Sequence, residues 1–486
     1  MKAVLPNNLL WTFFKNAGSQ IGGRLFLTGC RFLIAIIIIR QAGVATYGEY
    51  ALVLSLLLLA ECVVDFGMSD SVVRMMCQEP EKQPHLFYLL IQAKAILSIV
   101  GVVLLLGILW GMDYPTYLLL AGGIATLALL AFAGILILRT LFKINMLMER
   151  EVVAEIVSVV AVLPCIPFVA RLESALILLI GCYALSRYLF LFVGWFLGRD
   201  RLVVKCSGEF DNPDLAMVFK VSLSLGVSYI LIRVYDVLDP ILLSKMVSSE
   251  AVGHYLGCMR FLALLLMITY PVVTTAFPIL SSCWQKSMGR FEEVTQATFQ
   301  VVVVIAAWVL CIFNVSAGFF LGLMGEEMVV AKDIFRTLTL YAFLQSIMAF
   351  IGSLMIVSGG YTVVIMVTCL SVSTKLSLLF FFVPKYGGIG AAYASLTTEC
   401  IIIVLSWALI QRKIGFNFDW KLVTKVILIS FMLIYFINII GVRDQITGGI
   451  LAAVLFPVLI GVSGTVSLAQ FKHLVNAIRV RELREK

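Results

Sequence analysis

The sequence predicts an all-α polytopic membrane protein with about fourteen transmembrane helices. Hydrophobic residues make up 62% of the 486-residue chain and charged residues only 13%, whereas a soluble domain carries about 25% charged residues. Apolar runs of about 18 residues or more recur along the chain, and each is long enough to cross a hydrocarbon core. Because a lipid-exposed backbone must satisfy its own hydrogen bonds, these runs are expected to form helices.

The apolar runs predict fourteen spans, with ends accurate to a few residues. They cover residues 18–40, 47–70, 86–110, 115–138, 152–170, 175–198, 218–245, 251–280, 296–322, 333–358, 361–383, 388–410, 422–441 and 446–468. The fifth span contains Pro164 and Pro167, and only the turn Ser358-Gly359-Gly360 separates the tenth from the eleventh. Prolines break helices and glycines form tight turns, so these two regions give a range of twelve to fourteen spans.

Basic residues are distributed unevenly between the two sets of loops. One set, together with the C-terminal tail, holds 21 Lys and Arg residues, and the opposite set holds 6. Those six are Arg40, Arg171, Lys245, Lys332, Lys385 and Arg443. Because cytoplasmic loops are enriched in basic residues, both termini are expected in the cytoplasm, which requires an even number of spans.

A short repeat and a polar linker predict two pseudo-symmetric halves around a central cavity. Residues 40–50 align with residues 245–255, each with a basic residue, a glycine eight positions later and a tyrosine two positions after that. Such a repeat is typical of transporters, although a chance match between two interfacial turns stays open. The predicted parts are a six-helix bundle at 1–198, a cytoplasmic linker at 199–217, a second six-helix bundle at 218–410, two additional helices at 411–470 and a basic cytoplasmic tail at 471–486.

The predicted spans contain nine basic residues and only six acidic ones. Each charge at mid-bilayer costs about 2.5–3.5 kcal/mol on insertion scales, so these side chains are expected to face protein or a wet cavity. The excess of positive charge predicts a cavity that receives an anion. Its candidate substrate-binding residues are Arg24, Arg31, Lys94, Arg187, Arg233, Arg260 and Lys375.

The acidic residues and prolines of the spans each allow two interpretations. The candidate carboxylates for ion coupling, or for ion pairs with the basic residues, are Glu61, Asp65, Asp236 and Glu399. Arg233 and Asp236 are three residues apart, so they are placed to neutralise each other on one helix. Pro271 and Pro278 are candidate gating kinks, while static kinks that ease packing stay open.

Five short segments carry a resemblance to a known family. They are residues 34–50 with Tyr47-Gly48-Glu49-Tyr50, 65–69 with Arg74, 236–255 with Val252-Gly253-His254-Tyr255, 277–280 and 383–392. They occur in this order over about residues 9–410, and the last, Val-Pro-Lys-Tyr-Gly-Gly-Ile-Gly-Ala-Ala, is the most specific. Together they resemble the bacterial polysaccharide and O-antigen flippases, the lipid-linked oligosaccharide translocases of the multidrug/oligosaccharidyl-lipid/polysaccharide exporter superfamily.

The resemblance implies a transporter of the inner membrane, not an enzyme, with two six-helix bundles around a cavity. The implied activity is outward movement of undecaprenyl-pyrophosphate-linked oligosaccharide, such as O-antigen or another surface polysaccharide unit, by alternating access. No cofactor and no nucleic acid are expected. Coupling to a proton, a sodium ion or the membrane potential stays open, and a polysaccharide polymerase or glycosyltransferases are candidate partners besides the lipid bilayer.

Two alternatives to the flippase are compatible with a polytopic membrane protein. Multidrug/cation antiporters of the same superfamily share the architecture, but a cationic core suits a pyrophosphate better than a cationic drug. A membrane-embedded glycan polymerase or ligase would need a large outer loop, and no loop between the predicted spans exceeds about twenty residues.

The basic asymmetry predicts where reporter fusions will be active, because loops rich in Lys and Arg are retained in the cytoplasm. A cytoplasmic signal is expected for fusions after Arg74, Lys143, Lys205, Lys286 and Lys413. An outer signal is expected for fusions after Gly43, Asp113 and Lys385. Paired phosphatase and fluorescent-protein fusions measure both, and an outer signal at Lys205 would overturn the orientation and the two-half organisation together.

Overall fold

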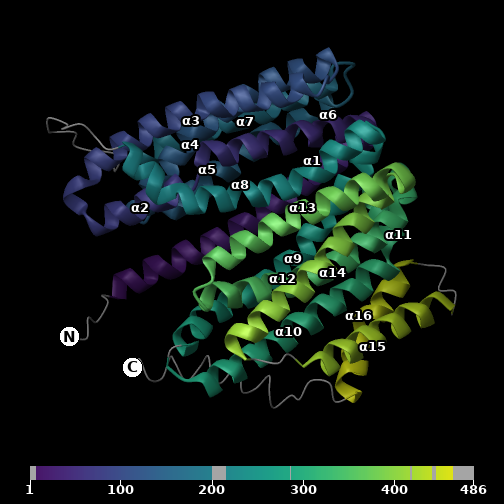
Figure 1. The fold of residues 1–486 in the computed structure, drawn as a ribbon. Helices are drawn as coiled ribbons and strands as arrows, with labels where there is room; N and C mark the ends of the chain where they lie inside the picture. The colour runs from purple at the N-terminus through teal and green to yellow at the C-terminus, as the bar shows by residue number, and fades with distance from the viewer. Residues whose placement is uncertain (1–6, 200–214, 285, 416–418, 440–444, 464–486) are drawn as a thin grey trace. The chain divides into compact units, whose positions relative to one another are not determined.

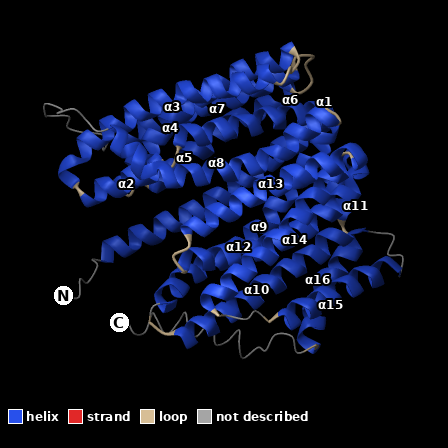
Figure 2. Cartoon of the chain, in the orientation of Figure 1, coloured by secondary structure: helices blue, strands red, loops and turns tan. Residues whose placement is uncertain are grey.

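The computed structural model describes residues 7–199, 215–284, 286–415, 419–439 and 445–463. All regular elements in these ranges are helices (Figures 1 and 2). Thirteen of them are long and apolar enough to cross a membrane. The predicted all-α membrane fold is therefore confirmed, while the predicted tail at 471–486 and most of the predicted linker lie outside the described residues.

The chain divides into two compact units. Unit 1 comprises Met1–Ser244 with Ser248–Gly253, and unit 2 comprises Lys245–Val247 with His254–Lys486. The helices that begin in unit 1 are α1 (Asn7–Asp65), α2 (Met68–Gln78), α3 (Gln83–Gly111), α4 (Thr116–Ile144), α5 (Met148–Val162), α6 (Ile166–Val169), α7 (Ala175–Gly198), α8 (Leu215–Met246) and α9 (Ser249–Trp284), with short 3-10 turns at Pro80–Lys82 and Leu163–Cys165. Unit 2 continues α9 and adds α10 (Met288–Val315), α11 (Ala317–Met324), α12 (Lys332–Val357), α13 (Tyr361–Tyr386), α14 (Gly388–Ile414), α15 (Trp420–Ile439) and α16 (Gln445–Val462), with a 3-10 turn at Glu326–Ala331.

The first two predicted spans form one helix, α1, that is broken at Gly43. The backbone of Gly43 has φ 86° and ψ 165°, which is not helical. L-residues with a side chain rarely adopt this conformation, so glycine is needed at the break. The break joins two spans without a loop, so one helix accounts for two of the fourteen predicted spans. The ninth predicted span, 296–322, is divided between α10 and the short α11.

The two ambiguous regions of the sequence have clear outcomes. In the fifth predicted span α5 ends at Val162, a 3-10 turn containing Pro164 follows, and the short α6 contains Pro167. Each proline lacks an amide donor and so removes one α-helical hydrogen bond, and here the helix gives way to a 3-10 turn between α5 and α6. The predicted turn at residues 358–360 is confirmed, with Gly359 at φ 75° between α12 and α13.

Unit 2 has a continuous apolar core in which α10 is central. α10 packs against α12, α15 and α16, and the core includes Phe299, Phe350 and Phe456, all fully buried. The two helices beyond the predicted second bundle, α15 and α16, therefore pack on unit 2. A further close contact joins α16 to the start of α11, where the Ser316 hydroxyl donates to the Gln445 carbonyl at 2.9 Å.

The two copies of the sequence repeat contact each other within unit 1 through their glycines. A Cβ added to Gly48 would lie 1.9 Å from the Ser249 carbonyl oxygen and 2.8 Å from the Gly253 amide nitrogen. A Cβ added to Gly253 would lie 2.1 Å from the Val44 carbonyl oxygen. The first turn of α9 thus packs backbone to backbone on α1, which explains why both copies carry glycine at the same position.

α8 also crosses the junction of α1 and α2 closely, through a second pair of glycines. A Cβ on Gly226 would lie 2.8 Å from the Phe66 carbonyl oxygen. A Cβ on Gly67 would lie 2.7 Å from the Leu225 Cβ, and Gly67 also has φ +64°. The contact groups α8 with α1 and α2, and it leaves no room for a side chain at either glycine.

Replacing Gly226 with valine is therefore expected to loosen α8 from the α1–α2 junction. Overpacking of this kind costs about 1–3 kcal/mol, and it should lower the thermal midpoint of the detergent-purified protein. Gly123→Val in α4 is the matched control, because a Cβ there meets nothing within 4 Å. Equal losses in the two variants would show that the crossing is not the cause.

Candidate functional site

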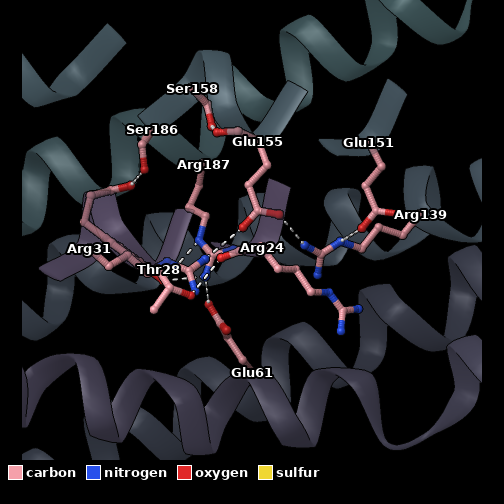
Figure 3. Close-up of polar contacts among 11 residues, drawn as sticks. Arg24, Thr28, Arg31, Glu61, Arg139, Glu151, Glu155, Ser158, Ser186 and Arg187 are labelled. Atoms are coloured by element: carbon pink, nitrogen blue, oxygen red, sulfur yellow. Dashed lines mark hydrogen bonds and ion pairs between the residues drawn. The ribbon is translucent and has the colours of Figure 1, made fainter. Parts of the chain in front are cut away.

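Four helices of unit 1, each long and apolar enough to cross a membrane, bring arginines and glutamates together (Figure 3). The contributors are Arg24, Arg31 and Glu61 from α1, Arg139 from α4, Glu151 and Glu155 from α5, and Tyr183 and Arg187 from α7. These residues are called the arginine cluster below. The two segments of α1 both contribute, one on each side of the break at Gly43.

Glu155 holds two arginines that come from different helices. Its Oε1 accepts from Arg31 Nη2 at 2.8 Å, and its Oε2 lies 3.4 Å from Arg139 Nη2. Arg139 Nε also lies 2.8 Å from Glu151 Oε1, and the Arg139 guanidinium faces the Phe190 ring at 5.7 Å. Charge-assisted contacts of this kind are stronger than neutral hydrogen bonds, so they tie α1, α4 and α5 together.

Arg187 and Glu61 form the most buried ion pair of the cluster. Arg187 Nη2 donates to Glu61 Oε1 at 2.9 Å, and the two side chains are 17% and 7% exposed. Arg187 also donates to the Tyr183 hydroxyl and lies over the rings of Phe132 and Tyr183 at 5.4 and 5.0 Å. Nε and Nη2 of this guanidinium thus both donate to protein acceptors, and the pair fixes the second segment of α1 to α7.

Arg24 and Arg31 are the accessible cations of the cluster. They are seven residues apart and so share one face of α1. The Arg31 side chain is 55% exposed although it binds Glu155. Arg24 is also exposed, and no acidic side chain of the described residues lies within 4.0 Å of its guanidinium. Both can offer donors to a ligand.

Lys94, another predicted ligand, lies in a separate contact at the end of α1. Its ammonium donates to the Val64 carbonyl at 3.2 Å, to the Asp65 carbonyl at 2.9 Å and to Asp65 Oδ1 at 2.9 Å. Lys94 is fully buried, and Ser69 donates a further bond to Asp65 at 2.6 Å. The lysine thus caps the last carbonyls of a helix, as basic side chains often do. Its predicted contact with substrate remains a prediction.

The ion pair expected from the three-residue spacing of Arg233 and Asp236 is present on α8. The two side chains are 3.1 Å apart and about half exposed. Both side chains lie on α8, within unit 1.

The remaining predicted residues belong to unit 2. Lys375 of α13 and Glu399 of α14 are buried, at 1% and 6% exposure, and Arg260 of α9 is half-buried. α9 runs through both Pro271 and Pro278 as one helix. Ligand contact, ion coupling and gating by these residues remain predictions.

Sequence reasoning left three central members out of the candidate site: Arg139, Glu151 and Glu155. Arg139 and Glu151 fall just outside the predicted spans 115–138 and 152–170, whereas α4 extends to Ile144 and α5 begins at Met148. Extending each of these two predicted helices by a few residues would have included both side chains, because each lies one residue beyond the predicted end. Glu155 was within a span, but its arginine partners are distant in sequence.

The buried pair predicts an unequal effect of two arginine substitutions. Arg187→Leu leaves Glu61 buried without its partner, which should cost about 3–5 kcal/mol of stability. Adding Glu61→Leu should recover most of this loss. Arg31→Gln is the control, because half-exposed pairs contribute only about 0–1 kcal/mol. Thermal midpoints and membrane protein levels measure the effect, and a double variant no more stable than Arg187→Leu would contradict it.

The whole fold resembles solved transporters. The lipid II flippase MurJ in an inward closed conformation matches with a TM-score of 0.72 at 12% identity, covering 91% of this chain and 98% of that one. A multidrug resistance MATE family transporter of the MOP superfamily, inward-facing, matches with a TM-score of 0.65 at 12% identity, covering 80% and 94%. A Pyrococcus furiosus MOP superfamily transporter, described by the reverse polarity of its binding pocket, matches with a TM-score of 0.56 at 12% identity, covering 82% and 95%.

These likenesses show the fold, which is that of the MurJ and MATE transporters. A sequence comparison with curated proteins finds no match. The profile of one family does match, over residues 13–284, which include the whole arginine cluster. The chain is thus a multi-pass membrane protein that belongs to the polysaccharide biosynthesis protein family.

Proposed function

We propose that this protein is a flippase that moves undecaprenyl-pyrophosphate-linked oligosaccharide, a surface polysaccharide unit such as O-antigen, from the cytoplasmic to the outer leaflet of the bacterial inner membrane. The observation that supports this most is the arginine cluster, with four arginines for three glutamates. Guanidinium groups bind phosphate oxygens through paired hydrogen bonds. Arg24 and Arg31 are exposed on one helix face, so they are placed to receive the pyrophosphate.

Glu155 gives the cluster a way to accept an anion without leaving a buried charge bare. It binds both Arg31 and Arg139. When a pyrophosphate oxygen takes the place of Glu155 at Arg31, the carboxylate keeps its contact with Arg139. The buried Arg187–Glu61 pair stays in place and holds α1 against α7 during the exchange. Binding therefore requires a change of partner at one half-exposed arginine only.

The membrane potential favours transport in the proposed direction. Moving one elementary charge across 100 mV changes the free energy by about 2.3 kcal/mol, and a bridging pyrophosphate carries two negative charges. Outward movement from a negative-inside cell therefore gains about 4–5 kcal/mol. A proton or a sodium ion would add to this through the candidate coupling carboxylates Asp65, Asp236 or Glu399, and a polymerase or glycosyltransferases would be the partners that consume or supply the substrate.

A multidrug/cation antiporter is the second candidate, and the fold likeness to the MATE transporter supports it. The cluster favours it less, because each of its glutamates already contacts an arginine. A cationic drug would have to compete with a guanidinium for every one of these carboxylates. An anionic headgroup meets two exposed arginines instead.

The proposal predicts a loss of transport without a loss of protein. Deletion of the gene should accumulate a lipid-linked oligosaccharide on the cytoplasmic side and abolish surface glycan. Arg24→Gln and Arg31→Gln, each removing one phosphate donor, should lower surface glycan by about tenfold or more, since hydrogen bonds to charged groups contribute about 1.5–3 kcal/mol. Glycan display, lipid-linked intermediates and membrane protein level are measured together.

The matched control is Lys82→Gln, which removes a basic residue whose ion pair with Glu79 is on the surface, with side chains 62% and 48% exposed. It should keep normal glycan display. Full transport by both arginine variants would refute anion binding at the cluster. Resistance to cationic drugs that disappears on deletion, with normal surface glycan, would instead support the antiporter.

A further inference from the structure

A polar cavity lies in unit 1, lined by residues other than those of the arginine cluster. It has a volume of about 440 Å³, within the range of about 300–1,000 Å³ typical of small-molecule sites. The break in α1, the start of α4 and the turn between α6 and α7 surround it, at the end of the bundle where Figure 1 labels α6. Arg171 lines this cavity and belongs to the loops with few basic residues, so the cavity is expected to open on the outer side.

The lining offers hydrogen-bond acceptors and donors together. Gln41 Oε1 is buried and has no hydrogen-bond partner among the described residues. Glu49 accepts from the Tyr117 hydroxyl at 2.7 Å, and the exposed Ser174 and Arg171 add donors at the rim. An unsatisfied buried acceptor costs stability unless a ligand or water supplies its donor.

The charges of the lining disfavour an anionic ligand. Glu49 and Glu173 contribute two negative charges and Arg171 one positive charge. A phosphate would meet a net negative surface here, in contrast to the arginine cluster. A saccharide suits the lining, because each of its hydroxyls both donates and accepts, and the apolar face of a sugar ring packs on an aromatic ring such as Tyr117.

The cavity and the arginine cluster lie at different heights along the same helices, α1 and α7. Gln41 follows Arg31 by ten residues, which corresponds to about 15 Å along an α-helix. Ser174 precedes Arg187 by thirteen residues, which corresponds to about 20 Å. An extended oligosaccharide of a few sugars can bridge this distance while its pyrophosphate remains at the cluster.

We infer that this cavity is a saccharide-binding site on the outer side of unit 1, where Gln41, Glu49 and Tyr117 bind sugar hydroxyls and a sugar ring. This inference extends the proposed function and depends on it, because the bound sugars would belong to the translocated lipid-linked glycan. Binding there would hold the glycan on the outer side and oppose its return.

Substitutions of the lining test the contribution of these hydrogen bonds. Gln41→Leu removes the buried acceptor at nearly constant volume, and Thr46→Val removes a hydroxyl at the cavity wall. Each should slow the appearance of surface glycan about threefold to tenfold, the effect of losing one hydrogen bond, at normal protein level. Unchanged rates in both variants would overturn the role of the cavity in transport.

Crosslinking tests occupancy directly. Benzoylphenylalanine is placed at Leu172, which lines the cavity and is 53% exposed. The control position is Val330, which is 82% exposed in a turn beside Lys332, another residue of the basic-poor loops. Irradiation of intact cells should give a glycan-bearing adduct at Leu172 and not at Val330. An adduct without glycan, or equal labelling at both positions, would overturn the inference.

Mild acid distinguishes the two sources of the saccharide. A lipid-linked glycan loses its polyprenyl pyrophosphate when the sugar–phosphate bond is cleaved, whereas a soluble saccharide adduct keeps its mass; both results support the site. Accumulation of the lipid-linked intermediate in the deletion strain is measured in parallel. No accumulation refutes the proposed function while a glycan adduct still supports the cavity, and accumulation with no glycan adduct at Leu172 refutes the cavity alone.

Discussion

The cost of an unpaired charge in the hydrocarbon region governs the assembly of unit 1. Every glutamate of the arginine cluster contacts an arginine from a different helix. α1, α4, α5 and α7 must therefore meet at this level, because separating any of them would expose a charge at a cost of several kcal/mol. For the same reason, the surplus of arginine over glutamate in the cluster points to a role other than packing. A protein that needed only neutral packing would gain nothing from an extra cation at this depth.

The packing of glycines is the second determinant of unit 1. Gly48 with Gly253, and Gly67 with Gly226, let backbones approach where a single methyl group would collide. Helices in membranes gain little from hydrophobic association, so close van der Waals contact through small residues becomes a main source of stability. This explains how α8 and the first turn of α9 can join unit 1 even though they follow the long polar segment after α7. The glycines and the ion pairs hold different levels of the same bundle.

Local information in the sequence predicted local features well. The apolar runs gave the helices, and a spacing of three residues gave the Arg233–Asp236 pair. Pairs distant in sequence were not predictable: Arg31 and Glu155 are 124 residues apart, and composition shows only that some partner is required. Helix ends were also beyond reach, because a hydropathy pattern stops at a charge such as Arg139 although the helix continues. Lys94 shows the reverse problem, since a buried cation can serve a helix end as well as a ligand.

The odd number of charges in the arginine cluster has a consequence for the return half of a transport cycle. If the proposed function holds, the empty site is cationic, with one more arginine than glutamate, and a bound pyrophosphate with two negative charges would make it anionic. In such a cycle, a membrane potential negative inside would favour outward movement of the loaded site and inward movement of the empty site. The same membrane potential would thus favour both the loaded and the empty step of the cycle. The turnover rate would then depend on voltage even at saturating substrate concentration. A carrier with equal numbers of the two residues would lack this assistance on the empty stroke.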